Sequence, residues 1–99
     1  MISSTDKDKI LEIAKAYGVK KVLLFGSSVS SDSDAHDIDL AVDGICPNDF
    51  YSFYGDLIFS LSKPVDVVDM ADNSKFIRMI NREGVTLYVS VLLTASFFR

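Results

Sequence analysis

The sequence is poor in the residues that build disulfides, zinc sites and secretion signals. Its 99 residues include one cysteine, Cys46, and one histidine, His36. One cysteine cannot form an internal disulfide, and one histidine cannot complete a Cys/His zinc tetrad. The first nine residues are mostly polar, and no apolar run reaches the roughly 18 residues of a membrane span. These absences predict a protein of the reducing cytoplasm without a membrane segment.

Positive charge is scarce as well. Ten lysines and arginines stand against 14 aspartates and glutamates, for a net charge of −4. A surface that follows a phosphate backbone needs a clustered excess of positive charge, so long nucleic acid is not expected as a partner. Apolar residues make up 48% of the chain, which excludes an intrinsically disordered protein. A chain of this length builds one core, and residues 1–99 are expected to form a single domain.

Apolar residues recur with helical spacing in three segments and form short β-rich runs in four others. The predicted helices are residues 6–17, between Thr5 and Gly18, then 50–61, and 75–83 after the cap Ser74. The predicted strands are 22–25, 37–42, 65–70 and 85–91. A Ser/Asp run from Ser27 to Asp34 predicts a loop between the first two strands. The order predicts an α/β (α+β) fold, a small sheet with flanking helices.

Two apolar stretches bear on packing. The helix expected over 50–61 carries one wide stripe, which includes Tyr54 and Ile58 and is predicted to be buried. Apolar residues also continue from Val91 to Phe98, as a tail from about residue 89. Completion of the core and an interface with another protein or a second copy both explain such a tail.

Two aspartates share one face of the second predicted strand. Asp37 and Asp39 lie two residues apart, so their carboxylates point the same way and repel each other unless a cation lies between them. Magnesium prefers such hard oxygen ligands, and a two-metal site needs a third carboxylate, which Asp66 on the third strand can supply. The alternative is a solvated strand face that carries no ligand.

A glycine and a serine end the first predicted strand. Gly26 lets the backbone come close to a ligand, and the Ser27 hydroxyl can donate to a phosphate oxygen. The alternative is an ordinary turn in which Ser27 serves only as a cap.

The order of these motifs resembles the minimal nucleotidyltransferase family of the DNA polymerase β superfamily. The hallmark of that family is a Gly-Ser turn after a strand, followed by an Asp-x-Asp strand. This sequence reads Leu-Phe-Gly-Ser at 24–27, then nine residues, then Asp-Ile-Asp-Leu at 37–40. The resemblance continues through 65–69 and 81–88, and it covers about residues 5–88.

The resemblance implies a small mixed sheet of the polymerase β palm type and a magnesium-dependent transfer of a nucleoside monophosphate. The matching positions imply nucleotide binding by Gly26, Ser27 and Ser28, and two magnesium ions held by the catalytic residues Asp37, Asp39 and Asp66. Asp66 is also implied to act as the base toward the incoming hydroxyl. Attack on the α-phosphorus then expels pyrophosphate without a covalent enzyme intermediate.

The resemblance also implies a partner. Minimal domains of this kind resemble the antitoxin of HEPN/MNT toxin–antitoxin pairs, which implies transfer of AMP from ATP to a tyrosine hydroxyl of a small helical HEPN-type protein. The family usually has one or two arginines in the loop where this chain has Ser-Val-Ser-Ser at 28–31. That loss of a phosphate clamp favours a second interpretation, a weakened or inactive module that neutralises its partner by binding. A small-molecule acceptor ranks third.

Overall fold

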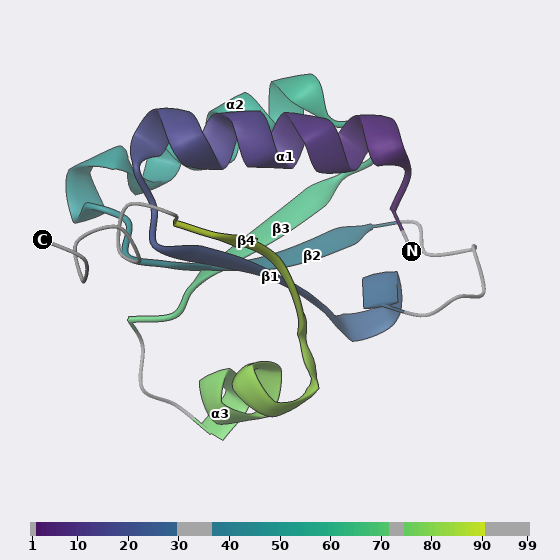
Figure 1. Cartoon of the computed structure of the whole chain (residues 1–99), viewed down its shortest axis with the longest axis vertical. Helices are drawn as coiled ribbons and strands as arrows, with labels where there is room; N and C mark the ends of the chain where they lie inside the picture. Colours follow the sequence, from purple (N-terminus) through teal and green to yellow (C-terminus); the bar gives the residue numbers. More distant parts are fainter. Residues whose placement is uncertain (1, 30–36, 72–74, 91–99) are drawn as a thin grey trace, which may run out of the picture.

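The computed structural model describes residues 2–29, 37–71 and 75–90, in which helices and strands alternate as the sequence predicts (Figure 1). The helices are α1 (Ser4–Tyr17), α2 (Phe50–Ser60) and α3 (Lys75–Glu83). The strands are β1 (Lys21–Phe25), β2 (Ile38–Asp43), β3 (Val65–Asp69) and β4 (Val85–Val89). Two short 3-10 helices, η1 (Gly26–Val29) and η2 (Pro47–Asp49), follow β1 and precede α2.

The four strands form one mixed sheet in the order β3-β2-β1-β4. β1 is antiparallel to both of its neighbours, and β2 is parallel to β3 through the crossover that contains α2. Figure 1 shows α1 and α2 on one face of the sheet and α3 alone on the other. The predicted fold class, a small mixed sheet with flanking helices, is confirmed.

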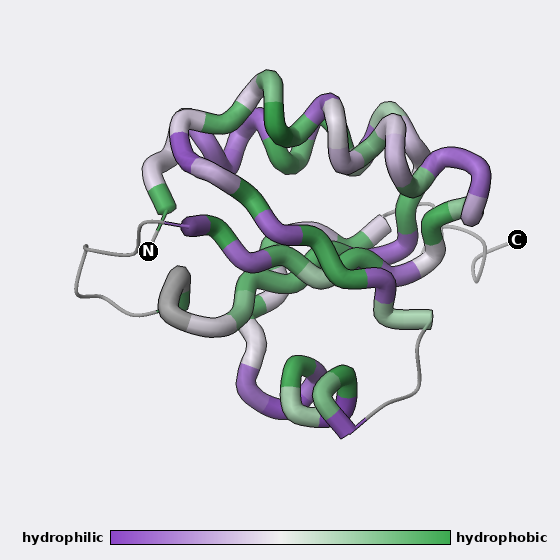
Figure 2. The backbone as a smooth tube through the Cα atoms, turned by 180° about the vertical axis from the view of Figure 1, so that it is seen from behind, coloured by the Kyte–Doolittle hydropathy of each residue, from purple (hydrophilic) through white to green (hydrophobic). Residues whose placement is uncertain are grey.

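Strand periodicity divides the core into two clusters. Leu24 and Leu40 point to the face of α1 and α2 and pack in a large cluster with Phe53. Leu23 and Ala41 point the other way, into a small cluster with α3. Figure 2 shows hydrophobic residues along the central strands, and a mixture of hydrophobic and hydrophilic residues in α3.

Local hydrogen bonds set the limits of α1. The side chain of Ser3 accepts a hydrogen bond from the backbone N–H of Asp6 at 3.1 Å, which makes Ser3 the N-cap. The prediction that Thr5 precedes the helix is therefore wrong, because Ser3, two residues earlier, accepts the hydrogen bond of the Asp6 N–H. Gly18 ends the helix with φ of 65°, as predicted. The buried Asp6 carboxylate also accepts a 3.0 Å bond from the backbone N–H of Ser62, which ties α1 to the end of α2.

Three further expectations need correction. Ile58 is 57% exposed, because the buried stripe of α2 is narrower than its apolar sequence and is centred on Phe53 and Leu57. The start of the Ser/Asp run is not a loop, since residues 26–29 form η1. Strand β4 ends at Val89. The predicted cap Ser74, the rest of the Ser/Asp run and the apolar tail from 91 lie outside the described residues.

The helices of the described segments are all too short or too polar to cross a bilayer.

Candidate functional site

Three neighbouring strands bring the candidate residues to one end of the sheet. Phe25, the residue before Gly26, lies opposite Asp39 in the β1–β2 register, and Asp39 lies opposite Asp66 in the β2–β3 register. Paired residues on adjacent strands project from the same face. Asp39 and Asp66 therefore share the face that α3 covers, with Asp37 exposed just before β2.

Gly26 lies against the carboxylate of Asp39. Its φ is +67°, and a Cβ added there would lie 2.6 Å from the Asp39 Oδ2 atom. The backbone conformation therefore favours glycine, and a Cβ at this position would also displace the Asp39 carboxylate. The sequence predicts that this glycine admits a ligand, and the group that the structure places against it is the Asp39 carboxylate.

The three carboxylates repel one another. Partial burial raises the pKa of Asp39 above its ordinary value, and the negative charges of Asp66 and then Asp37 raise it further. A bound cation would relieve this repulsion.

Tyr54 holds the third carboxylate from the far side of the sheet. Its hydroxyl donates a 3.3 Å hydrogen bond to Asp66 Oδ1 and accepts one from the backbone N–H of Val67. Burial, and the charge of Asp66, raise the pKa of Tyr54 above its ordinary value. Since β3 is an edge strand, the hydroxyl of this α2 residue reaches both groups. Sequence reasoning placed Tyr54 in the core, and only its hydroxyl distinguishes it from a phenylalanine there.

The glycine turn continues into η1, which contains the backbone of Ser27 and Ser28. Neither a lysine nor an arginine lies between residues 26 and 29. A cavity of about 270 Å³ opens beside the turn, between the end of β1 and α3. Sequence reasoning did not identify this cavity, which two segments distant in the chain form together.

Magnesium fits the chemistry of these donors, which are hard, negatively charged oxygens that repel one another. Among the residues that the structure describes, no three carboxylate, histidine or cysteine side chains are close enough together to hold a metal ion. The fold thus places Asp39 and Asp66 on adjacent strands, but the described carboxylates do not form a preassembled metal site.

Comparison with known families gives one match over most of the chain. The model of the family described as polymerase beta, nucleotidyltransferase matches residues 8–90. Among curated protein sequences, none matches the chain.

Solved structures of toxin–antitoxin complexes have chains of similar fold. A toxin–antitoxin complex with AMP-PNP aligns with a TM-score of 0.70 and 22% identity, over 85% of this chain and 73% of that one. The MntA–HepT complex aligns with a TM-score of 0.67 and 20% identity, over 96% and 80%. A complex of a tri-AMPylated HEPN toxin with an MNT antitoxin, from Shewanella oneidensis, aligns with a TM-score of 0.66 and 21% identity, over 93% and 76%. At these identities the likeness concerns the fold.

Proposed function

Because this chain belongs to the polymerase β nucleotidyltransferase family, we propose that it transfers a nucleoside monophosphate, AMP from ATP, to a hydroxyl group of a partner protein. The observation that carries the proposal is the row formed by Asp39 and Asp66 on adjacent strands, with the Gly26 turn beside it at the end of β1. That row places a close-approach turn beside coupled carboxylates, the two features that a metal triphosphate requires.

Each residue has a distinct task in this proposal. The backbone N–H groups of the turn at Gly26, Ser27 and Ser28 hold the phosphates. Asp37, Asp39 and Asp66 bind two magnesium ions, which when bound stabilise negative charge on the attacking and leaving oxygens. The acceptor oxygen forms a bond to the α-phosphorus as the bond to the β-phosphate oxygen breaks, and pyrophosphate leaves. The Asp66 carboxylate takes the proton of the acceptor hydroxyl.

Tyr54 acts in this scheme as a positioning residue. Its hydrogen bond to Asp66 Oδ1 restricts the carboxylate to one orientation and leaves Oδ2 for the metal and the acceptor proton. A tyrosine hydroxyl is protonated, and therefore able to donate, throughout the neutral range, and the raised pKa of Tyr54 acts in the same direction.

We propose a small helical HEPN-type toxin as the partner, with this chain as its antitoxin. Support comes from the similar folds, which are found in toxin–antitoxin complexes, one of them with AMP-PNP and one with a tri-AMPylated HEPN toxin.

A second candidate is neutralisation of the partner by contact alone. Two observations favour it. Segment 26–29 lacks the cationic residue that would grip a phosphate, and α2 exposes a large apolar surface at Tyr51 (82%) and Phe59 (91%).

Intact-mass spectrometry of a HEPN-type protein from the same organism, co-expressed with this chain, separates the two candidates. We expect added adenylyl groups with the wild type, none with Asp39→Asn, and normal transfer with Asp43→Asn, which makes the same change at the other end of β2. A stable complex whose partner gains no mass with the wild type would contradict the transferase and support the binding module.

A further inference from the structure

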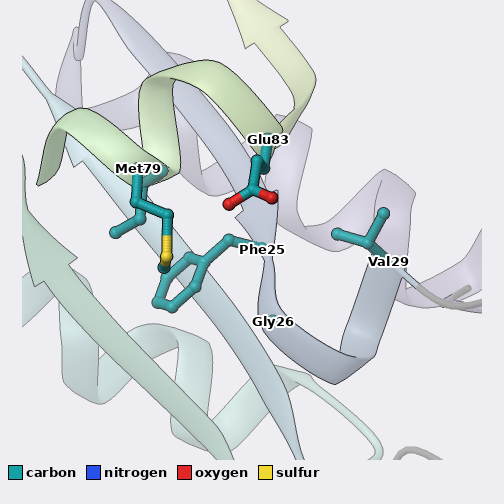
Figure 3. Close-up of a pocket in the computed structure, with 6 residues that line it drawn as sticks. Phe25, Gly26, Val29, Met79 and Glu83 are labelled. Atoms are coloured by element: carbon teal, nitrogen blue, oxygen red, sulfur yellow. The ribbon is translucent and has the colours of Figure 1, made fainter. Parts of the chain in front are cut away.

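The cavity beside the Gly26 turn has mostly apolar walls. Phe25 and Val29 line it from the end of β1 and η1, and Met79, Ile80 and Glu83 line it from α3 (Figure 3). Pockets for drug-sized ligands start at about 300 Å³. A cavity of about 270 Å³ therefore has room for one flat ring system rather than for a whole nucleotide.

Two of the lining residues, Phe25 and Met79, suit an aromatic ligand. The ring of Phe25 is held edge-on against Phe76, with centroids 5.6 Å apart and an interplanar angle of 82°. Figure 3 shows the Met79 side chain extending from α3 so that its sulfur lies beside the Phe25 ring. Aromatic faces and polarizable sulfur both make favourable contacts with flat rings.

One charged group defines the polarity of the cavity. Glu83 points its carboxylate from the last turn of α3 toward the glycine turn (Figure 3), and a carboxylate only accepts hydrogen bonds. Inside the cavity, this carboxylate would repel a phosphate, whereas it would attract a ring that carries N–H groups.

We propose that this cavity binds the base of the donor nucleotide, and that Glu83 accepts a hydrogen bond from the exocyclic amino group of a purine. The inference rests on the proposed function, because Gly26 belongs both to the phosphate-binding turn and to the cavity wall. Adenine carries this amino group at ring position 6 and guanine at position 2. Hypoxanthine and uracil lack an exocyclic amino group, and each offers a single ring N–H beside carbonyl oxygens that a carboxylate repels.

Two matched pairs of triphosphates test the recognition of the amino group by calorimetry with magnesium. ATP is compared with purine riboside triphosphate, which lacks only the 6-amino group, and GTP with ITP, which lacks only the 2-amino group. We expect the amino-bearing member of one pair to bind roughly tenfold or more tightly, as for a hydrogen bond to a charged group. That pair identifies the base. Equal affinities within both pairs would overturn the proposed role of Glu83.

A pair of glutamate variants links this discrimination to one side chain. Glu83→Ala is expected to abolish the difference within the pair, and Glu12→Ala, on the exposed side of α1 across the sheet, to leave it unchanged. Full discrimination in Glu83→Ala would overturn the assignment.

Methyl NMR of labelled methionines locates the base independently of the phosphates. Adenosine and guanosine, which have no phosphate, are the probes. We expect the nucleoside of the preferred base to shift the Met79 methyl signal more than that of Met70, which packs on the same cluster but does not line the cavity. A Met79→Leu variant assigns the signal.

The outcomes separate the two proposals. A Met79 shift by a nucleoside, without magnesium-dependent triphosphate binding, would overturn the proposed function and support the cavity. Magnesium-dependent binding of ATP or GTP with an unshifted Met79 signal would overturn the cavity and support the function. The absence of both would overturn both.

Discussion

The two faces of the sheet differ in what they contain. The face under α1 and α2 carries the large cluster of buried apolar residues, whereas the face under α3 carries a cluster of four, Leu23, Ala41, Ile77 and Ile80. The row of carboxylates and the cavity lie on the thinly covered face. The larger part of the hydrophobic core and the candidate site thus lie on opposite faces of the sheet. Substitutions on the first face should mainly affect stability, and substitutions on the second should mainly affect the site.

The largest expected effect is on the thickly covered face. Phe53 is fully buried between α2 and the sheet, and Phe53→Ala should lower the free energy of unfolding by about 3–5 kcal/mol. Ile77→Ala, in the cluster of four, is expected to cost about 2 kcal/mol, at the low end for such a truncation. Urea denaturation with unchanged m-values measures both. If Ile77→Ala lowered the free energy of unfolding more than Phe53→Ala did, the α3 face would contribute more to stability than the face under α1 and α2.

A glycine on the α3 face should show the next largest effect. In Gly26→Ala, the left-handed backbone costs about 1–2 kcal/mol and the new Cβ meets Asp39 Oδ2, which adds about 1–3 kcal/mol of overpacking. Gly18→Ala is the matched control, because Gly18 has nearly the same φ of +65° and nothing within 4 Å of the added Cβ.

The double variant Gly26→Ala/Asp39→Ala isolates the clash. We expect it to recover most of the difference between the two alanine variants, because the carboxylate that blocks the Cβ is then absent. Equal unfolding free energies for Gly26→Ala and Gly18→Ala would show that the close approach has no energetic consequence.

A smaller effect, on the rate of the proposed reaction, is expected at Tyr54, which links α2 on one face of the sheet to Asp66 on the other. Tyr54→Phe removes the hydrogen bond to Asp66 together with the one from Val67; the loss at Asp66 should slow the proposed transfer by roughly two- to fivefold at unchanged KM for the nucleotide, as for a loss of about 0.5–1 kcal/mol. Tyr17→Phe removes a comparable bond to Asp56 on the α1/α2 face and should leave the rate unchanged. Equal rates for the wild type and Tyr54→Phe would remove Tyr54 from the site.

The smallest expected effect concerns charge. The raised pKa of Asp39 means that the folded state binds its proton more tightly than the unfolded state does. Ionised Asp39 therefore opposes folding above its folded pKa, and this opposition disappears as the pH falls below the unfolded value. Asp39→Asn should raise the Tm slightly at pH 7 and not at pH 3, as measured by thermal melts. A lower Tm at pH 7 would indicate a structural role for the carboxylate.

The sequence predicts the elements well because their apolar periodicity is strong, and the Asp37/Asp39 pair because alternation along one strand is a local property. The sequence does not locate the N-cap of α1, because Ser3 and Thr5 are both good caps and only the hydrogen bond from the Asp6 N–H decides between them. The exposure of Ile58 depends on where α1 lies beside α2. Neither the link from Tyr54 to Asp66 nor the cavity could be predicted, because each joins elements through tertiary packing alone.

The most direct test of the account is a thermal melt with ATP, with and without magnesium, on the wild type, Asp39→Asn and Asp43→Asn. At 100 times the dissociation constant a ligand adds about 2.7 kcal/mol, and about 1 kcal/mol moves the Tm of a domain of this size by roughly 4–8 °C. The account predicts a magnesium-dependent rise of about ten degrees or more in the wild type and in Asp43→Asn, and none in Asp39→Asn. An equal rise in all three proteins, or none in the wild type, would contradict a nucleotide site at the carboxylate row.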